Sequence, residues 1–336
     1  MAQPLTLPVT LSSWSGAQVR VAEVLAELEA LRRPELMPAT RTSVLTLVVV
    51  ASSRDALGEA MAGVYELGGR HPARVLCLLP DRSGDGASSG LDAEVRLLGG
   101  EAEGQAVWFE DVELVVRGEA ASHLDSLIEP FTLADLPVVV WFVGELPRVD
   151  DPLLRAADVV MVDARTFGDT ECFDVLTELA RRVAIVDLSW HRLQPWRELL
   201  AALFESPHTR PYLPGITSAR VVGRTGPRHL LAGWIADRLD LPFSEVHVEP
   251  ATHVSISLAG TLPATGQHGT FEVLRLSDER VVHTRTAVDG GPSSEMVVPL
   301  PPPTAGWGVA AALSHLDRDP VYERALRSAI AVAARH

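Results

Sequence analysis

Residues 130–147, PFTLADLPVVVWFVGELP, decide the fold of the chain. They contain six consecutive apolar residues at 138–143, VVVWFV, all of them β-branched or aromatic, and prolines bound the stretch at both ends. Such a run without alternation is typical of a central strand that is covered on both faces. We therefore expect a buried parallel strand here.

A second landmark follows at 187–204, where a short strand leads into DLSWHRLQPWRELLAALF. Pro195 suits the first turn of a helix, because its missing N–H would be unpaired there in any case. The apolar residues that follow have the spacing of one helical face: Trp196, Leu199, Leu200, Leu203 and Phe204. This pattern predicts an amphipathic helix packed on the core.

Strand and helix patterns alternate on both sides of these landmarks. We expect strands at 43–51, 73–79, 95–98, 106–116, 158–164 and 183–188, and helices at 18–32, 54–67, 119–128 and 170–182. The pair at 95–98 and 106–116 is expected to form an antiparallel excursion or a sheet edge. Alternation of this kind predicts a doubly wound, mostly parallel sheet with helices on both faces. The N-terminal domain is therefore expected to be α/β and Rossmann-like, and to cover residues 1–207.

Residues 208–336 are expected to form a smaller α+β domain with an antiparallel sheet and C-terminal helices. Beyond residue 242 short alternating strands follow one another closely, which predicts an antiparallel meander. After PLPPP at 299–303, Asp319 and Pro320 are a suitable cap and first turn for a C-terminal helix. The boundary lies in the linker at 206–215 or near 240, because the strand at 219–224 and the helix after it could still belong to the first sheet.

Composition excludes several classes of function. The chain has 336 residues and a net charge of −15, which opposes binding to a phosphate backbone, so we expect no nucleic-acid partner. Its 29 basic residues are all arginine, which removes Schiff-base and P-loop lysine chemistry. No apolar run is long enough to span a membrane and no signal core follows the N-terminus, so a cytoplasmic protein without membrane contact is expected.

The two cysteines do not indicate a disulfide framework or a metal site. Cys77 lies in VLCLL and is expected to be a buried small hydrophobe. Cys172 lies at an expected helix start, a position that can lower a thiol pKa, but a structural role is the simpler interpretation there too. Residues 81–90, DRSGDGASSG, are expected to be a mobile surface loop. A phosphate-binding loop would need a lysine or a helix directly after it.

Motifs of cofactor-binding and catalytic sites are missing from the sequence, among them G-x-G-x-x-G, G-x-S-x-G, H-E-x-x-H and the Walker sequence. The turn at 223–226, GRTG, could offer backbone amides to an anion, with Arg224, Arg228 and His229 beside a sugar phosphate. A plain tight turn is the simpler interpretation. His191 near Asp187 and Ser189 resembles a catalytic triad only weakly, because the three residues come from one strand end.

Two interpretations are open for Asp187, Trp190, Trp196 and Arg197. They close the carboxyl edge of the sheet, or they contribute to a protein interface, where tryptophan and arginine are enriched. Asp135, which precedes Pro137, is expected to be a loop or cap carboxylate. Our candidates for contact with a partner or a ligand are Asp135, Asp187, Trp190, Arg192, Arg197, Arg224 and Arg228.

Several patterns together resemble the OpcA family of glucose-6-phosphate dehydrogenase assembly or activator proteins, most closely its actinobacterial form. The resemblance runs from about residue 42 to the C-terminus and rests on residues His123, Asp125, Ser126, Pro130, Phe131, Leu133, Asp135, Pro137, Asp187, Trp190, Arg192, Trp196 and Arg197, with a weaker match at Gly233 and Trp234. It implies a non-catalytic factor, without a cofactor of its own, that binds glucose-6-phosphate dehydrogenase. Such a factor promotes assembly or activates the enzyme allosterically, and so supports NADPH production in the oxidative pentose phosphate pathway.

Cyanobacterial members of this family are linked to redox control through cysteines. The C-terminal cysteine pair has no equivalent in this sequence, so redox switching is not expected. The alternative function is an enzyme or sensor that binds a sugar phosphate or a nucleotide at the carboxyl edge of the sheet, the usual crevice in such folds.

Overall fold

The computed structural model describes residues 8–32, 43–67, 73–81, 89–102, 105–168, 170–276, 280–291 and 293–335. The chain divides into two compact units, and each is described by itself. The first comprises Met1–Val162, Arg182–Val186 and Thr304–Asp317, and the second comprises Asp163–Arg181, Asp187–Pro303 and Arg318–His336. The units are thus interleaved along the chain, and the single boundary at 207/208 or near 240 stays a prediction. The expected loop at 81–90 falls mostly outside the described residues.

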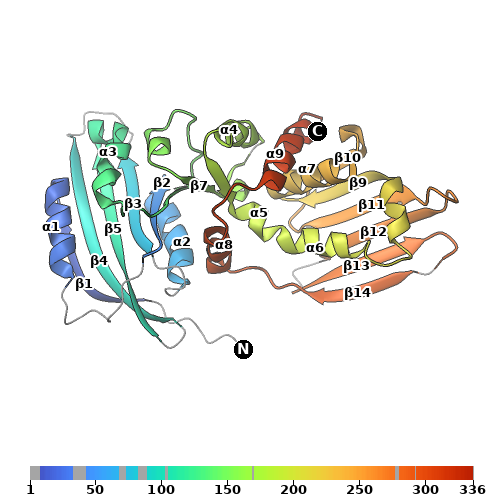
Figure 1. Ribbon diagram of the computed structural model, residues 1–336, viewed down its shortest axis with the longest axis horizontal. Helices are drawn as coiled ribbons and strands as arrows, with labels where there is room; N and C mark the ends of the chain where they lie inside the picture. The colour runs from blue at the N-terminus through green and yellow to red at the C-terminus, as the bar shows by residue number, and fades with distance from the viewer. Residues whose placement is uncertain are drawn as a thin grey trace. The chain divides into compact units, whose positions relative to one another are not determined.

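The first unit contains an eight-stranded sheet in the order β1-β4-β5-β3-β2-β6-β7-β8 (Figure 1). Its strands are β1 (Val9–Gly16), β2 (Leu45–Ala51), β3 (Ala73–Asp81), β4 (Gly90–Ala102), β5 (Gln105–Arg117), β6 (Val138–Val143), β7 (Val159–Val162) and β8 (Ala184–Asp187), whose last residue belongs to the second unit. Strand β6 lies between β2 and β7 and is parallel to both. Its first five residues are buried, so the prediction of a buried parallel strand at 138–143 is confirmed.

The antiparallel part of this sheet is larger than expected. β4 pairs with β5 antiparallel along 13 residues, as the sequence predicted for an excursion. β1 pairs antiparallel with the outer side of β4 and forms the edge, and the sequence analysis did not predict this strand. β5 in turn runs parallel to β3.

The helices of the first unit are α1 (Val21–Leu31), α2 (Arg54–Tyr65), α3 (Leu124–Ile128) and α8 (Ala305–Leu313), with 3₁₀ turns η2 (Gly118–Ser122), η3 (Glu129–Phe131) and η4 (Pro152–Arg155). The expected helix at 119–128 is therefore a 3₁₀ turn followed by one short α-helix. Helix α8, whose position in the sequence was not predicted, packs on α2, and the Gly306 amide donates to the Glu66 carboxylate at 2.8 Å. A Cβ on Gly63 would meet Ala305 at 3.3 Å, which shows how closely the two helices approach.

The second unit contains a six-stranded sheet in the order β10-β9-β11-β12-β13-β14. Its strands are β9 (Ile216–Gly223), β10 (Val246–Pro250), β11 (Ser255–Thr261), β12 (His268–Leu274), β13 (Val281–Val288) and β14 (Ser294–Pro299). The meander from β11 to β14 is antiparallel, as predicted. Strand β10 is an exception, because it runs parallel to β9 after the crossover helix α7 (Pro227–Leu239). The strand expected at 219–224 therefore belongs to this sheet and not to the first one.

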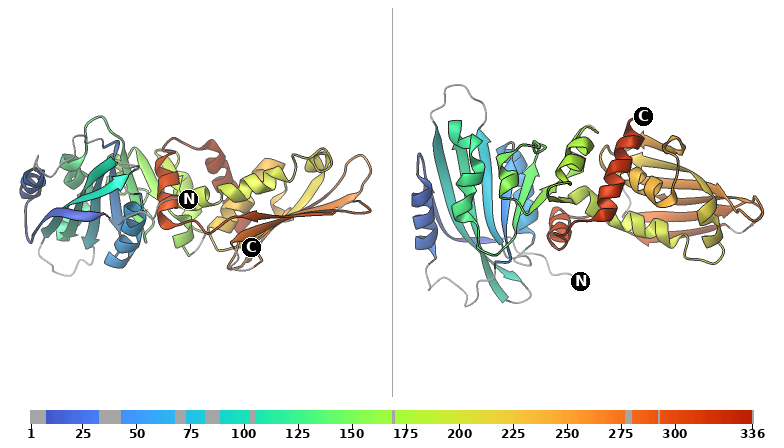
Figure 2. Two further views of the ribbon diagram at one scale, coloured as in Figure 1. Left: turned by 90° about the horizontal axis from the view of Figure 1, so that it is seen from below. Right: turned by 45° about the horizontal axis from the view of Figure 1, so that its top comes forward.

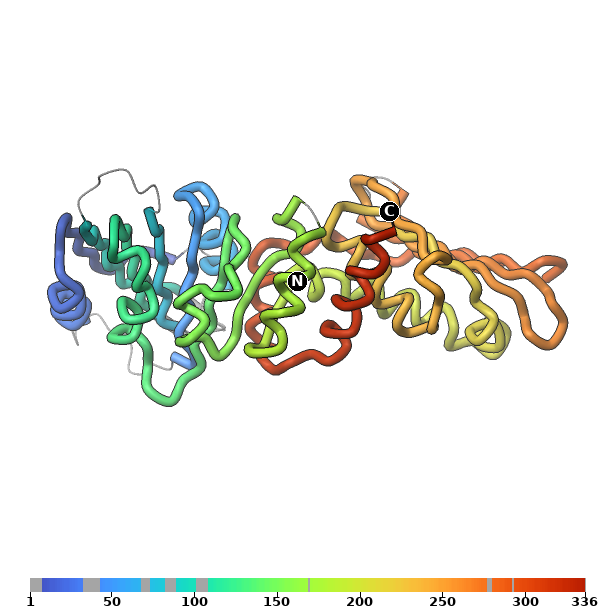
Figure 3. Tube along the Cα trace, turned by 90° about the horizontal axis from the view of Figure 1, so that it is seen from above, coloured from blue at the N-terminus to red at the C-terminus, as the bar shows by residue number. Residues whose placement is uncertain are grey.

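The other helices of the second unit are α4 (Cys172–Leu179), α5 (Leu188–Arg192), α6 (Gln194–Ala202) and α9 (Pro320–Ala333), with 3₁₀ turns η5 (Ala164–Thr166), η6 (Arg210–Gly215) and η7 (Phe243–Glu245). The expected tryptophan helix is thus preceded by the separate short helix α5. Helices α7 and α9 pack side by side (Figure 2; Figure 3). They touch at Gly233, where a Cβ would lie 2.3 Å from the Ala325 carbonyl oxygen, so only glycine fits. None of the helices in the described part of the chain is long and apolar enough to cross a bilayer.

Candidate functional site

Two buried carboxylates lie in the second unit, each where a strand ends. Asp163 follows β7 and accepts a hydrogen bond from the Arg165 amide at 3.2 Å, which starts η5. Asp187 ends β8 and accepts from the amides of Ser189 at 2.8 Å and Ala164 at 3.1 Å, which starts α5. Asp163 is 7% exposed and Asp187 is 1% exposed. Each carboxylate therefore satisfies backbone amides where the chain leaves the sheet.

Asp163 is balanced by positive charge. Arg192 approaches its Oδ2 atom at 2.8 Å and Arg165 approaches the same atom at 3.4 Å. The Ser189 hydroxyl donates to Oδ1 at 2.6 Å and accepts from the Arg165 amide at 2.9 Å. Two arginines and a hydroxyl therefore contact this carboxylate inside the unit.

Asp187 has a different environment. Its Oδ2 atom accepts a hydrogen bond from the Tyr322 hydroxyl at 3.3 Å. Burial and the nearby charge of Asp163 raise the pKa of Asp187 to about 7, although the amides of Ala164 and Ser189 oppose the rise. The two acids therefore differ in role, and Asp187 takes up a proton near neutral pH.

Trp190 and Arg197 form the other side of this cluster. The indole N–H of Trp190, which is buried, donates to Asp319 Oδ2 at 2.8 Å. The guanidinium carbon of Arg197 lies 3.4 Å from the centre of the Trp190 ring, a cation–π stack, and burial lowers the pKa of Arg197 to about 10. Asp319 also accepts from the amides of Val321 and Tyr322 at 2.8 and 3.1 Å, so the predicted cap of the C-terminal helix is confirmed.

The turn between β9 and α7 adjoins this cluster. A Cβ on Gly226 would lie 2.2 Å from the Ala164 carbonyl oxygen, and its φ is +82°, so the turn requires glycine for space and for conformation. Arg228 donates to the Gly223 carbonyl at 3.1 Å, and burial lowers the pKa of Arg228. Arg224 is exposed.

The structure thus brings together most of the candidates named from the sequence. Asp187, Trp190, Arg192 and Arg197 form one cluster, and the turn that carries Arg224 and Arg228 adjoins it. Asp135 is not part of it, because it is an exposed loop residue of the first unit with φ +62°. Their contact with a partner or a ligand stays a prediction.

Sequence reasoning missed Asp163, Arg165, Asp319 and Tyr322 as members of the cluster. The sequence contained a signal for two acids, because VVMVD and AIVD each place an aspartate at the end of an apolar strand pattern. The triad interpretation does not fit the geometry, since the Ser189 hydroxyl donates to Asp163. Both cysteines are buried, as was predicted for Cys77, and neither forms a disulfide bond.

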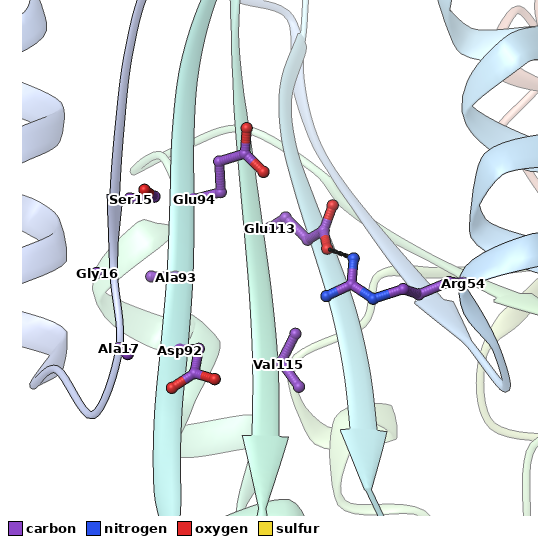
Figure 4. A pocket seen from close by; sticks show the side chains of 9 residues that line it. All are labelled: Ser15, Gly16, Ala17, Arg54, Asp92, Ala93, Glu94, Glu113 and Val115. Carbon is purple, nitrogen blue, oxygen red and sulfur yellow. Dashed lines mark hydrogen bonds and ion pairs between the residues drawn. The ribbon is translucent and has the colours of Figure 1, made fainter.

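A pocket of about 320 Å³ in the first unit lies beside β1, β4, β5 and the start of α2 (Figure 4). Its acids are paired: Glu113 with Arg54 at 2.6 Å, Asp92 with Arg117 at 2.7 Å and Glu94 with Arg96 at 3.6 Å. Figure 4 shows the Arg54 side chain directed at Glu113 across the strands. Among the described residues, no group of histidine, cysteine, aspartate and glutamate could hold a metal ion.

Two family models match consecutive parts of the chain. Residues 64–184 match the family described as the N-terminal domain of the glucose-6-phosphate dehydrogenase subunit. Residues 183–326 match the family described as the C-terminal domain of that subunit. The two matches together cover most of the chain and meet at the end of the first sheet.

Curated relatives carry the name "Putative OxPP cycle protein OpcA". The protein from Synechocystis is 29% identical over 181 residues, which are 50% of this chain and 37% of that protein. The one from Nostoc punctiforme is 24% identical over 246 residues, or 65% and 52% of the two chains. The one from Synechococcus elongatus is 26% identical over 330 residues, or 84% and 72%. The chain thus spans only about a third to a half of the first two relatives.

Among solved structures, the chain is similar to a glucose-6-phosphate 1-dehydrogenase from Mycobacterium avium. The TM-score is 0.47 at 11% identity, and the match covers 86% of this chain and 90% of the other.

Proposed function

Because the chain belongs to the OpcA family, we propose that it binds glucose-6-phosphate dehydrogenase and acts as a non-catalytic assembly factor and allosteric activator of that enzyme. The observation that carries the proposal is the pair of family matches, which cover 64–326 without a gap. The names of the curated relatives support a role in the same pathway. Activation of this dehydrogenase would increase NADPH production in the oxidative pentose phosphate pathway.

We place the contact with the enzyme at the arginines around the carboxylate cluster. Trp190 and Asp187 are buried, so we assign them a structural role in holding α5 and α6. The Trp190 ring also stacks against the Arg197 guanidinium. Arg192 is held by Asp163, whereas Arg224 is exposed and has no bonded acid among the described residues. An exposed guanidinium of this kind pairs well with a carboxylate of a partner, because its planar fork makes two parallel hydrogen bonds.

The proposal is tested by mixing the protein with the glucose-6-phosphate dehydrogenase of the same organism. Size-exclusion chromatography with light scattering should show a complex, and the rate of the enzyme or its dependence on glucose 6-phosphate should change. The protein alone should show no turnover of glucose 6-phosphate with NADP⁺. Unchanged sedimentation and unchanged kinetics of the enzyme at micromolar protein would contradict the proposal.

The proposed surface is tested separately by Arg224→Glu. Reversal of an exposed, unpaired charge leaves the fold intact but should weaken the complex at least tenfold, because an ion pair is replaced by repulsion. The matched control is Arg327→Glu on α9, which is also exposed and has no bonded acid among the described residues. If both variants bind the dehydrogenase with equal affinity, the β9–α7 turn is not part of the interface, although the proposed complex is not contradicted.

A further inference from the structure

A groove in the second unit lies between α6, η6 and α7 and reaches β11. Its volume is about 490 Å³, which is within the range of pockets that bind small molecules, about 300–1,000 Å³. Its walls are mainly apolar and include Leu200, Phe204, Trp234, Ile235, Leu239 and Leu258. We call it the α6–α7 groove, and it shares no lining residue with the carboxylate cluster.

An aromatic stack fixes one wall of the groove. The rings of Phe204 and Phe271 have centroids 4.6 Å apart, and Tyr212 packs on the same Phe271 ring at 5.5 Å. The Tyr212 hydroxyl donates to Gln267 at 3.1 Å. Leu258 pairs in register with Phe271, so both side chains lie on one face of the sheet, under α6 and α7. The groove is therefore preformed, and a ligand would not need to rearrange its walls.

The mouth of the groove has polar groups without partners. Arg210 and Arg238 are exposed, and neither has a bonded acid among the described residues. Trp234 is half-buried, and its indole N–H has no hydrogen-bond partner in the described part of the chain. Among the lining residues of the groove Glu205 is the one acid. The mouth thus has a net charge of +1 on a protein whose net charge is −15.

We propose that the α6–α7 groove binds a small amphipathic anion, such as the carboxylate of a medium-length aliphatic chain. The apolar body would lie against the aromatic and aliphatic walls and cover Leu213, which is 40% exposed at the mouth. The carboxylate would pair with Arg210 and Arg238, and the indole N–H of Trp234 would be a further donor. The proposal does not depend on the function proposed above.

The test is calorimetric titration of the full chain with decanoate, with decanol as the neutral counterpart. Wild type should bind decanoate saturably at one site per chain and bind decanol at least tenfold more weakly, because the arginines then have no anion to pair with. Ala201→Trp changes an exposed lining residue of α6 and fills the groove. Arg238→Glu removes one of the two cations, and Arg327→Glu is the control of equal charge change on α9.

Each groove variant should lose at least tenfold in decanoate affinity, and the control should match wild type. No saturable heat with wild type, or equal affinity of Ala201→Trp and wild type, would overturn the proposal. Equal affinity for decanol and decanoate would also overturn it, because the ligand would then not be an anion. A further outcome is that wild type does not bind decanoate, whereas Ala201→Trp no longer forms the complex with the dehydrogenase. The groove would then be a protein-docking surface, and the ligand proposal would be wrong. Should Ala201→Trp fail to fold, Arg238→Glu at an exposed position decides alone.

Discussion

Replacing Asp187 by asparagine should change how the stability of the protein depends on pH. Asparagine has the same shape, and its carbonyl oxygen can still accept from the amides of Ala164 and Ser189. Its amide group can donate to the oxygen of Tyr322, whose hydroxyl contacts Asp187 in the wild type. The substitution therefore removes the ionisable group while it keeps the hydrogen bonds.

The size of the effect follows from the pKa of Asp187. This pKa is raised from 3.8 to about 7, chiefly by burial. A raised folded-state pKa means that the folded protein holds the proton more tightly than the unfolded chain does. Stability is then lost as pH rises from about 4 to about 7, because only the unfolded chain ionises freely. At about 1.4 kcal/mol for each pH unit, wild type should lose about 3 kcal/mol between pH 5 and pH 8 through this group.

The assay is urea unfolding of wild type and Asp187→Asn at several pH values between 5 and 8. We expect the variant to gain stability relative to wild type as pH rises, by about 3 kcal/mol over this range. Asp289→Asn is the control, because Asp289 is exposed in the turn after β13 and should give no such trend. If the curves of wild type and Asp187→Asn run parallel, Asp187 is already ionised at pH 5 in the folded protein and the reasoning is refuted.

Other variants test the packing and the proposed contact. Trp196→Ala should cost about 3 to 5 kcal/mol of stability in thermal unfolding, since the side chain is buried, and should weaken binding to the dehydrogenase only as a consequence. Arg197→Ala should melt within a few degrees of wild type but bind the dehydrogenase more weakly; equal affinity would make its stack purely structural. Cys77→Ala combined with Cys172→Ser should leave activation unchanged with and without oxidant, because both thiols are buried, and an oxidant effect lost in the double variant would contradict this. Gly226→Ala should destabilise by more than about 1 kcal/mol, since φ is positive and the Ala164 oxygen lies in the way; a melting temperature like that of wild type would show that the turn relaxes.

Patterns that depend on local burial were predictable from the sequence. Strand β6 lies within the continuous apolar run at 138–143, because a strand covered on both faces has no reason to alternate. The meander in the second unit was equally visible, since strands with one covered face alternate. In both cases the burial of each position determines whether its residue is apolar or polar, so the pattern can be recognised in the sequence.

Elements whose stability comes from a distant partner were not predictable. Strand β1 reads VTLSSWSG, is mostly exposed, and exists because β4 lies beside it. Helix α8 begins with glycine-containing AGWG, a poor helix former, and is held by α2 through Glu66 and Gly63. β1 pairs with a strand about 80 residues away, and α8 contacts a residue 240 positions away. Such distant contacts produce no local periodicity in the sequence.

The candidate cluster also depends on residues that are distant in the sequence. Its contacts explain why Asp187 is an acid, although burying a charge costs free energy. Two chain reversals, after β7 and after β8, expose backbone amides at Ala164 and Ser189 inside the unit. An apolar residue in place of Asp187 would avoid the cost of burying a charge but would leave both amides unpaired, each at about 1–3 kcal/mol. The carboxylate accepts from both with one oxygen and offers the other to Tyr322, 135 residues away. The acid is thus fixed by the backbone amides that it satisfies, whereas its pKa is raised by burial, which only the folded unit provides, and by the neighbouring carboxylate of Asp163.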